Sequence, residues 1–340
     1  MKWIEDFLSY RKQRVFVEGA FSEWSDIYSG IPQGSVLGPI LFLVYINDLP
    51  DVVSDCCVKF FADDTKLYKE INSEEDSCVL QDNIDNMFDW SDKWQLRFHP
   101  DKCQVLNIGS SADHFTYSMC NYEGSRINLT STVIQKDLGV FVDNELIFRS
   151  HILKVVSKAN GILGTIRRTF RFLDKDSLLL LYKAMVRPVI EYGFPAWSPL
   201  YQKDIDSIEA VQRRATRLVP GFCDFSYEDR LRRLELPSLT YRRARGDMIY
   251  VYKYLHGDVS SHACLFQLSS ITFTRGHMFK LMKPRALTSL RLKFFTQRVI
   301  DHWNLLPDFV VSAPSLNCFK NRLDKHWSSS PGLYNYKDIV

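Results

Sequence analysis

The spacing of apolar residues in the first half of the chain predicts short helices and strand pairs in alternation. Residues 1–28 fit a helix, WIEDFLSYRKQ, followed by a strand pair, RVFVEGAFSEW, that turns near Gly19. The apolar run from Val36 predicts a helix that begins close to Pro39, because proline is tolerated only in the first turn of a helix. Residues 57–71 read as two strands joined by a tight turn.

The pattern then becomes polar and afterwards helical. Residues 73–94 predict an acidic helix, and LRFHPDKCQVLNIG predicts a strand with a Pro-Asp turn inside it. Beyond residue 150, HILKVVSKANGILGTIRRTF places Lys154, Lys158, Thr165 and Arg168 on one helical stripe. The opposite, apolar face comprises Ile152, Val155, Val156, Ala159, Ile162, Leu163 and Ile166.

Two further segments extend this helical region. DSLLLLYKAMVRPVIEY is apolar almost all round, which predicts a buried helix. KDIDSIEAVQRRATRLVPG predicts another amphipathic helix, closed by Pro220 and Gly221. Three consecutive helices of this kind predict a compact helical bundle.

Charge is divided unevenly along the chain. Residues 1–150 contain 13 Lys and Arg against 24 Asp and Glu, a net charge of −11, whereas residues 151–340 have a net charge of +14. A basic half is a candidate for binding nucleic acid. The alternative, that these charges only cover solvated faces, remains open.

Composition narrows the class of protein. The 340 residues are 46% hydrophobic and 24% charged, as in an ordinary globular protein. The eight cysteines form no C-x-x-C pair, so a structural zinc site and a disulfide-linked partner are not expected. The first residues lack a secretory pattern, and the longest apolar run is too short to span a bilayer. We expect a nuclear or cytoplasmic protein that is neither secreted nor in a membrane.

FADDTKLY contains the first candidate for chemistry, the adjacent carboxylates Asp63 and Asp64. Aspartate is common in turns, so the pair can be purely structural. Alternatively, the tip of a hairpin presents both carboxylates to Mg²⁺, which prefers hard oxygen ligands. A dication would relieve the repulsion between the two neighbouring charges. Both interpretations remain open for the pair alone.

SGIPQGSVLGPILF contains the second candidate. Glycines and a proline surround Gln33, so the backbone there can approach a ligand closely. The glutamine amide both donates and accepts hydrogen bonds, which suits a base or a sugar. A glycine-rich loop by itself is a weak signal.

Taken together, several long motifs resemble one family. SGIPQGSVLGPILFLVYINDLP, KFFADDTKLY, WQLRFHPDKCQVLNIG and KDLGVFVDNELIFRSHI are similar, in this order, to the palm motifs of reverse transcriptases from non-LTR (LINE-type, jockey-like) retrotransposons. The resemblance continues through LYKAMVRPVIEYGFPAWSP and IEAVQRRATRLVPG to the C-terminal segment HWNLLPDFVVSAPSLNCFKNRLDKHW.

The resemblance implies a function and a set of site residues. The function is extension of a DNA primer on an RNA template with deoxynucleoside triphosphates. Asp63 and Asp64 match the aspartates that bind the catalytic Mg²⁺ ions, and Lys102 matches a lysine near the nucleotide's phosphates. Positions matching the nucleotide and template contacts are Pro32, Gln33, Gly34 and Phe61. Leu138 and Gly139 match the primer grip.

Candidate phosphate contacts lie in the basic helices, and the same side chains can instead form a solvated helix face. They are Arg167, Arg168, Arg213, Arg214 and Arg217. The implied fold is α+β: an incomplete palm of a right-hand polymerase at residues 1–150, a thumb-like helical bundle at 151–222 and a mixed, basic region at 223–340.

The family's metal site also needs an aspartate on an earlier palm strand, which the resemblance places ahead of this chain together with the fingers. Glu5, Asp6, Glu18 and Asp48 are poor substitutes at the positions predicted for them. We therefore expect residues 1–340 alone to be inactive. The alternative is a non-catalytic nucleic-acid-binding remnant, or a translated fossil without a function.

Overall fold

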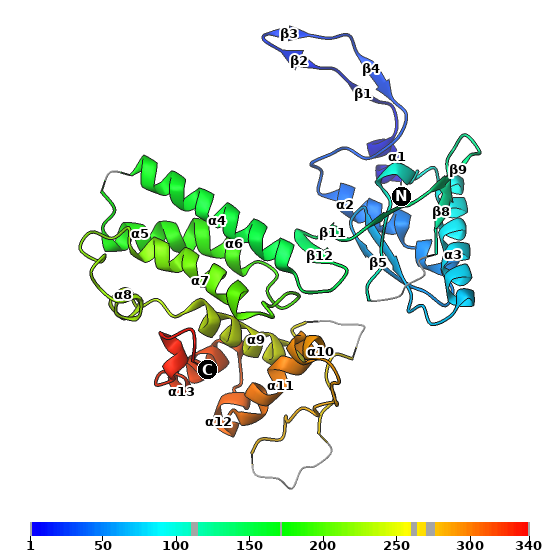
Figure 1. The fold of residues 1–340 in the computed structure, drawn as a ribbon. Coiled ribbons are helices and arrows are strands. Elements are labelled where there is room, and N and C mark those ends of the chain that lie inside the picture. Colours follow the sequence, from blue (N-terminus) through cyan, green and yellow to red (C-terminus); the bar gives the residue numbers. More distant parts are fainter. Residues whose placement is uncertain (1, 110–114, 171, 260–263, 270–275, 339–340) are drawn as a thin grey trace. The chain divides into compact units, whose positions relative to one another are not determined.

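The computed structural model describes residues 2–109, 115–170, 172–259, 264–269 and 276–338 (Figure 1). Helices and short strands both occur, which confirms the α+β class. The chain forms two compact units: unit 1 is Met1–Val105 with Ser111–Thr132, and unit 2 is Leu106–Ser110 with Val133–Val340. The three-part division at residues 150 and 222 stays a prediction.

Unit 1 is built from helices and two-stranded sheets. Its helices are α1 (Lys2–Leu8), α2 (Leu37–Ile46) and α3 (Glu74–Lys93), with 3-10 turns at Leu49–Val52 and Pro100–Lys102. The strands up to residue 132 are β1 (Arg11–Gln13), β2 (Phe16–Val17), β3 (Ala20–Phe21), β4 (Ser25–Ile27), β5 (Cys57–Phe61), β6 (Asp64–Tyr68), β7 (Gln104–Leu106), β8 (Ser118–Cys120), β9 (Arg126–Asn128) and β10 (Thr130–Thr132). They pair as β1–β4, β2–β3, β5–β6, β8–β9 and β7–β10.

Helix α3 organises the core of unit 1. A capping box starts it: the Ser73 hydroxyl accepts the Asp76 amide, and the Asp76 carboxylate accepts the Ser73 amide. Its buried face includes Met87 and Trp90, which pack with Ile46 of α2 and with Leu49. This core supports the β5–β6 hairpin, whose Phe60 and Leu67 pack against it.

The first part of unit 1 is exposed. None of the described side chains from residue 2 to residue 37 is buried, and large apolar side chains such as Trp3, Phe16 and Trp24 are exposed. The turn predicted near Gly19 is confirmed, with Glu18 and Gly19 at positive φ. The Arg14 guanidinium lies 3.8 Å from the centre of the Phe21 ring. The hairpin is therefore held by its own backbone pairing and by this cation–π contact.

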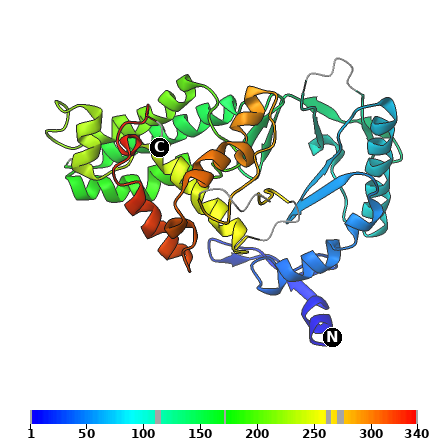
Figure 2. The same cartoon turned by 90° about the horizontal axis from the view of Figure 1, so that it is seen from below.

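Unit 2 is mostly helical (green to red in Figures 1 and 2). It begins with the hairpin β11 (Ile134–Asp137) and β12 (Val140–Asp143). Its helices are α4 (Arg149–Thr169), α5 (Lys175–Leu181), α6 (Arg187–Glu191), α7 (Gln202–Thr216), α8 (Tyr227–Leu234), α9 (Leu239–Leu255), α10 (Ser289–Lys293), α11 (Phe295–Leu305), α12 (Asp308–Val311) and α13 (Leu316–His326), with a 3-10 turn at Pro331–Leu333. One core spans Val140 to Leu239, and a second spans Tyr241 to Trp327.

Helix α4 confirms the amphipathic prediction. Ile152, Ala159 and Leu163 are buried, while Lys154 and Lys158 are exposed. Two contacts fix the direction of α7 relative to α4: an ion pair joins Arg149 to Asp204, and Arg214 donates to Asn160. Arg149 and Asp204 lie near the starts of α4 and α7, and Asn160 and Arg214 lie further along the same two helices. The two helices therefore run parallel.

The helix predicted over DSLLLLYKAMVRPVIEY forms as one unbroken helical run from Lys175 to Glu191, but it is buried on one side only. The segment is divided into α5, a π-helical turn at Tyr182–Val186 and α6. Burial follows a four-residue spacing at Leu178, Tyr182, Val186 and Ile190. Leu180 on the other side is 70% exposed. A run of consecutive apolar residues has no period, so the sequence could not show which side faces the core.

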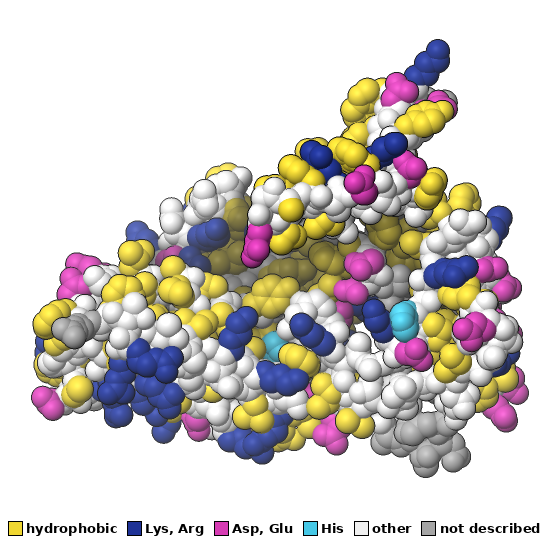
Figure 3. All heavy atoms as spheres, turned by 90° about the horizontal axis from the view of Figure 1, so that it is seen from above, with side chains coloured by type: hydrophobic (Ala, Val, Ile, Leu, Met, Phe, Trp, Pro, Cys, Tyr) yellow, Lys and Arg dark blue, Asp and Glu magenta, His cyan; other side chains and the backbone are white. Residues whose placement is uncertain are grey.

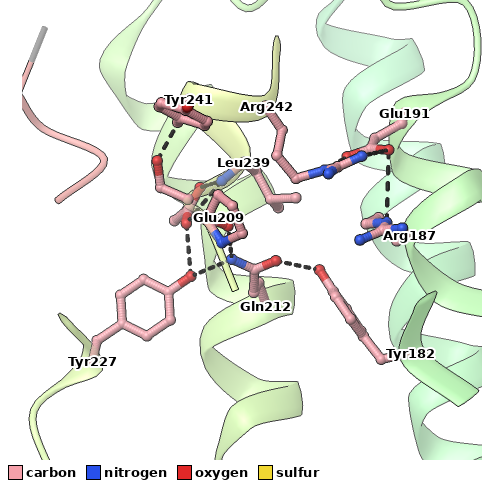
Figure 4. A network of polar contacts seen from close by, with 11 residues as sticks. Tyr182, Arg187, Glu191, Glu209, Gln212, Tyr227, Leu239, Tyr241 and Arg242 are labelled. Carbon is pink, nitrogen blue, oxygen red and sulfur yellow. Dashed lines mark hydrogen bonds and ion pairs between the residues drawn. The ribbon is translucent and has the colours of Figure 1, made fainter. Parts of the chain in front are cut away.

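Polar contacts connect α7 to its neighbours in unit 2 (Figure 4). The Glu209 carboxylate, fully buried, accepts from the Tyr227 hydroxyl at 2.6 Å and from the Leu239 amide at 3.1 Å. Gln212 accepts from the Tyr182 hydroxyl at 2.7 Å and donates to the Tyr227 hydroxyl at 3.2 Å. Glu209 and Gln212 therefore join α7 to α8 and to the start of α9.

Several arginines of the basic region are paired within unit 2. Arg242 of α9 binds the Glu191 carboxylate through two nitrogens, and Arg245 binds Asp324 of α13 in the same way. Such two-nitrogen pairs hold both side chains in a fixed geometry, and they are stronger than single neutral hydrogen bonds. These arginines therefore contribute to packing between helices.

Gly246 lets α9 approach the segment that follows α6. A Cβ built on Gly246 would lie 2.3 Å from the Phe194 ring, whereas one on Gly161 of α4 would meet nothing within 4 Å. We expect Gly246→Ala to lower the free energy of unfolding by about 1–3 kcal/mol through overpacking. Gly161→Ala, the control, should raise it by up to about 1 kcal/mol. Urea unfolding of both variants measures this, and equal effects would contradict it.

Candidate catalytic hairpin and nucleic-acid-binding helices

The hairpin predicted around Asp63 and Asp64 is confirmed. Strands β5 and β6 pair from Cys57 opposite Tyr68 to Phe61 opposite Asp64, which leaves Ala62 and Asp63 as the turn. Ala62 has a φ of 53°, in the left-handed region that glycine adopts more readily. Strained backbone of this kind persists only where the surroundings enforce it, and it is common at functional sites.

The two faces of the hairpin differ. Phe60 and Leu67 are half-buried and contact the core of unit 1. The opposite face is exposed and includes Phe61, of which 63% is accessible. Alternation along each strand places Asp64 on this exposed face, opposite Phe61.

Both aspartate side chains are open to a ligand. Asp63 and Asp64 are exposed, and neither carboxylate forms a hydrogen bond or an ion pair with the residues that the structure describes. Adjacent carboxylates without a cationic partner provide the hard oxygen ligands that Mg²⁺ prefers. Within the described ranges no group of three or more His, Cys, Asp or Glu residues could hold a metal ion. The pair fits a site that is completed by water and by substrate phosphates.

The loop with Pro32, Gln33 and Gly34 is fixed at its end and open at its centre. The Ser35 hydroxyl donates to the Pro32 carbonyl at 2.8 Å and accepts the Gly38 amide at 3.0 Å. Gly34 has a φ of 80°, and the Gln33 side chain is exposed. The backbone is thus held while Gln33 remains available to a ligand.

Lys102 is exposed at the end of its 3-10 turn, directly before Cys103 and β7. No hydrogen bond or ion pair joins Lys102 or Gln33 to either aspartate in the described part of the chain. The structure therefore places these candidates in unit 1 without a hydrogen bond or an ion pair between them in the described residues.

In unit 2 the residues Leu138 and Gly139 form the turn of the β11–β12 hairpin, with φ angles of 44° and 87°. Tyr192, which motif reasoning did not single out, donates its hydroxyl hydrogen to the Leu138 carbonyl at 2.8 Å. Nothing in the local sequence signals this contact, because 54 residues separate the two positions.

The candidate phosphate contacts fall into two groups. Arg167 and Arg168 are exposed in the last turn of α4 without a partner among the described residues. Arg213 donates to the Tyr336 hydroxyl at 3.0 Å and lies over the Tyr227 ring. Arg214 donates to Asn160, and Arg217 is exposed.

Because α4 and α7 run parallel, their C-terminal turns lie at the same end of the helix pair. Basic side chains there complement the helix dipoles, which is the purely structural explanation. Lys and Arg side chains also gather in groups on the molecular surface (dark blue in Figure 3). Arg167, Arg168 and Arg217 are exposed and have no side-chain partner among the described residues, so they are the candidates most available to phosphates.

Comparisons with known proteins indicate the class of protein to which the first half of the chain is similar. Residues 1–150 match the family described as reverse transcriptase (RNA-dependent DNA polymerase). This match and the relatives below confirm the resemblance to reverse transcriptases of non-LTR retrotransposons.

The individual relatives are proteins of mobile elements. The chain is 28% identical over 236 residues to the "RNA-directed DNA polymerase from mobile element jockey" of Drosophila funebris, an alignment that covers 64% of this chain and 25% of that protein. It is 25% identical over 226 residues to the "Probable RNA-directed DNA polymerase from transposon X-element" of Drosophila melanogaster, covering 64% and 24%. The chain thus spans about a quarter of the length of these relatives. No solved structure matches it significantly.

Two further observations concern membrane-spanning helices and cysteines. No helix in the described ranges is both long and apolar enough to cross a membrane. All eight cysteines lie in described segments and have free thiols.

Proposed function

We propose that the chain is the part of an RNA-directed DNA polymerase that contains its metal-binding hairpin and the helices that bind the primer and template. The observation that carries this proposal is the pair of exposed, unpartnered carboxylates at the β5–β6 turn, within the segment that matches the reverse transcriptase family. The partners would be an RNA template, a DNA primer and deoxynucleoside triphosphates.

The side chains have separate roles in this proposal. Asp63 and Asp64 would hold Mg²⁺, which when bound stabilises charge on the phosphoryl oxygens. The exposed Gln33 amide would contact the nucleotide or the template base through its donor and acceptor atoms. The Lys102 ammonium group would stabilise phosphate charge and donate a proton to the leaving pyrophosphate. Phe61 and the backbone at Pro32 and Gly34 would line the same nucleotide contact.

An exposed stripe of α4 supports the nucleic-acid-binding part of the proposal. Lys158, Gly161, Thr165 and Arg168 follow each other at helical spacing and are all exposed. Small residues between basic ones let a phosphate backbone approach the helix closely. Lys154, at the start of the stripe, lies 3.3 Å from the centre of the Phe141 ring, so its ammonium group is partly engaged. Lys158 and Arg168 are therefore the residues to test.

We expect primer–template binding that weakens steeply with salt, because phosphate contacts release counterions. Replacing Lys158 and Arg168 by alanine together should lower the slope of log K against log[salt] by about 1.4–1.8. A matched variant, Lys325→Ala with Lys337→Ala, also removes two exposed positive charges but from the far C-terminal segment. Fluorescence anisotropy across a salt series measures both slopes.

The control pair should leave the slope unchanged. Equal changes in both variants would show only a general charge effect, and salt-independent binding would contradict the electrostatic account. A second function, nucleic-acid binding without catalysis, is favoured by the lack of a third metal ligand near the pair in the described residues.

A further inference from the structure

The turn of the β11–β12 hairpin has a strained backbone. Leu138 and Gly139 both have positive φ, which suits a two-residue hairpin turn but is costly for leucine. Such a conformation persists only when neighbouring groups enforce it. Neither amide of these two residues donates a hydrogen bond to a described residue, so both are available to an acceptor such as a phosphate oxygen.

Tyr192 contacts this turn directly. Its hydroxyl donates to the Leu138 carbonyl at 2.8 Å, and a Cβ built on Gly139 would lie 3.1 Å from its ring. The tyrosine is 57% exposed, so it contacts the turn without burying it. The hydrogen bond fixes the orientation of the peptide group between Leu138 and Gly139.

The segment after Tyr192 holds the rest of the hairpin. Gly193 has a φ of 65°, and a Cβ there would lie 3.2 Å from the Val140 side chain. The buried Trp197 donates its indole N–H to the Tyr192 carbonyl at 2.9 Å. The same indole contacts His151, whose Nδ1 accepts the Phe141 amide at 3.3 Å. The position of Tyr192 is thus set by packing that also fixes β12.

We propose that Tyr192 is a positioning residue, which holds the Leu138–Gly139 turn in the conformation that contacts the primer strand. This inference rests on the proposed function and on the resemblance that matches Leu138 and Gly139 to the primer grip. Tyr192 acts through the turn and need not touch nucleic acid. A turn that samples other conformations would contact a primer end less often, so the loss should appear in primer–template affinity.

The first test measures the turn itself. In the full chain, Tyr192→Phe removes the hydrogen bond and keeps the ring against Gly139. We expect amide hydrogen exchange in peptides covering residues 134–143 to become about three- to tenfold faster, because a net hydrogen bond is lost from the closed hairpin. Tyr201→Phe is the matched control, since the Tyr201 hydroxyl has no partner in the described part of the chain. Unchanged exchange in Tyr192→Phe would overturn the inference.

The second test measures the affinity for nucleic acid. Tyr192→Phe should weaken binding of a recessed DNA primer on an RNA template about three- to tenfold. Affinity for single-stranded RNA of equal length, held by the basic helices, should not change. Faster exchange with unchanged primer–template affinity would overturn the role in primer contact and leave the proposed function intact. If the wild-type chain bound neither nucleic acid, the proposed function itself would fail, and this inference with it.

Discussion

Residues 1–340 alone are expected to give no measurable primer extension with Mg²⁺ or Mn²⁺. Asp63 and Asp64 come from one turn and supply ligands from one side only, and the described residues offer no third ligand beside them. Mg²⁺ dehydrates reluctantly, so a site with two adjacent ligands should bind it loosely.

The control for this prediction is a longer chain. Residues 1–340 joined to the segment that precedes the matching region in a jockey relative should extend a primer. Robust extension by residues 1–340 alone, lost in Asp63→Ala, would show that another carboxylate of this chain completes the site.

Glu209→Ala is expected to destabilise unit 2 by about 2–4 kcal/mol. The variant leaves the Tyr227 hydroxyl and the Leu239 amide without a buried acceptor and opens a cavity between α7 and α9. Chemical unfolding of the full chain measures the loss. Glu145→Ala, which removes an exposed glutamate, is the matched control and should have an effect within about 0.5 kcal/mol.

Glu209 should also make the free energy of unfolding depend on pH. Burial raises the pKa of the Glu209 carboxyl above its ordinary value of 4.5, although Arg243 and Arg213 oppose the shift. The folded state therefore binds this proton more tightly than the unfolded state does. The Glu209 carboxyl therefore contributes fully to the free energy of unfolding below pH 4.5, and this contribution declines as the pH rises through the raised pKa. Glu209→Gln should remove this decline, and an unchanged pH profile would contradict the assignment.

Much of the local structure could be predicted from the sequence. The amphipathic spacing of α4 and the strand–turn–strand pattern around Ala62 are local signals, and each element forms where its pattern lies. The site residues in unit 1 follow from motifs that fall on these elements. Their exposure agrees with a ligand-binding role but is not encoded in the motif itself.

Other features depend on contacts between distant residues. The apolar run from Leu178 to Leu181 gave no period, so its exposed side and the π-helical turn could not be predicted. Arg242 and Arg245 lie in the region predicted to be basic, yet their carboxylate partners are 51 and 79 residues away. Tyr192 was missed for the same reason. Tertiary pairing decides whether a charge or an aromatic ring is free, and sequence spacing does not reveal it.

The most direct test of the central claim is single-turnover nucleotide incorporation by the joined chain with Asp63→Ala. Losing a ligand that stabilises charge in phosphoryl transfer removes roughly 4 kcal/mol or more, which corresponds to a rate about 10³-fold lower. Asp82→Ala, an exposed aspartate of α3, is the matched control and should react at the wild-type rate. A loss confined to Asp63→Ala is the predicted result. Equal rates for Asp63→Ala and the wild type would show that the β5–β6 turn does not form the catalytic site.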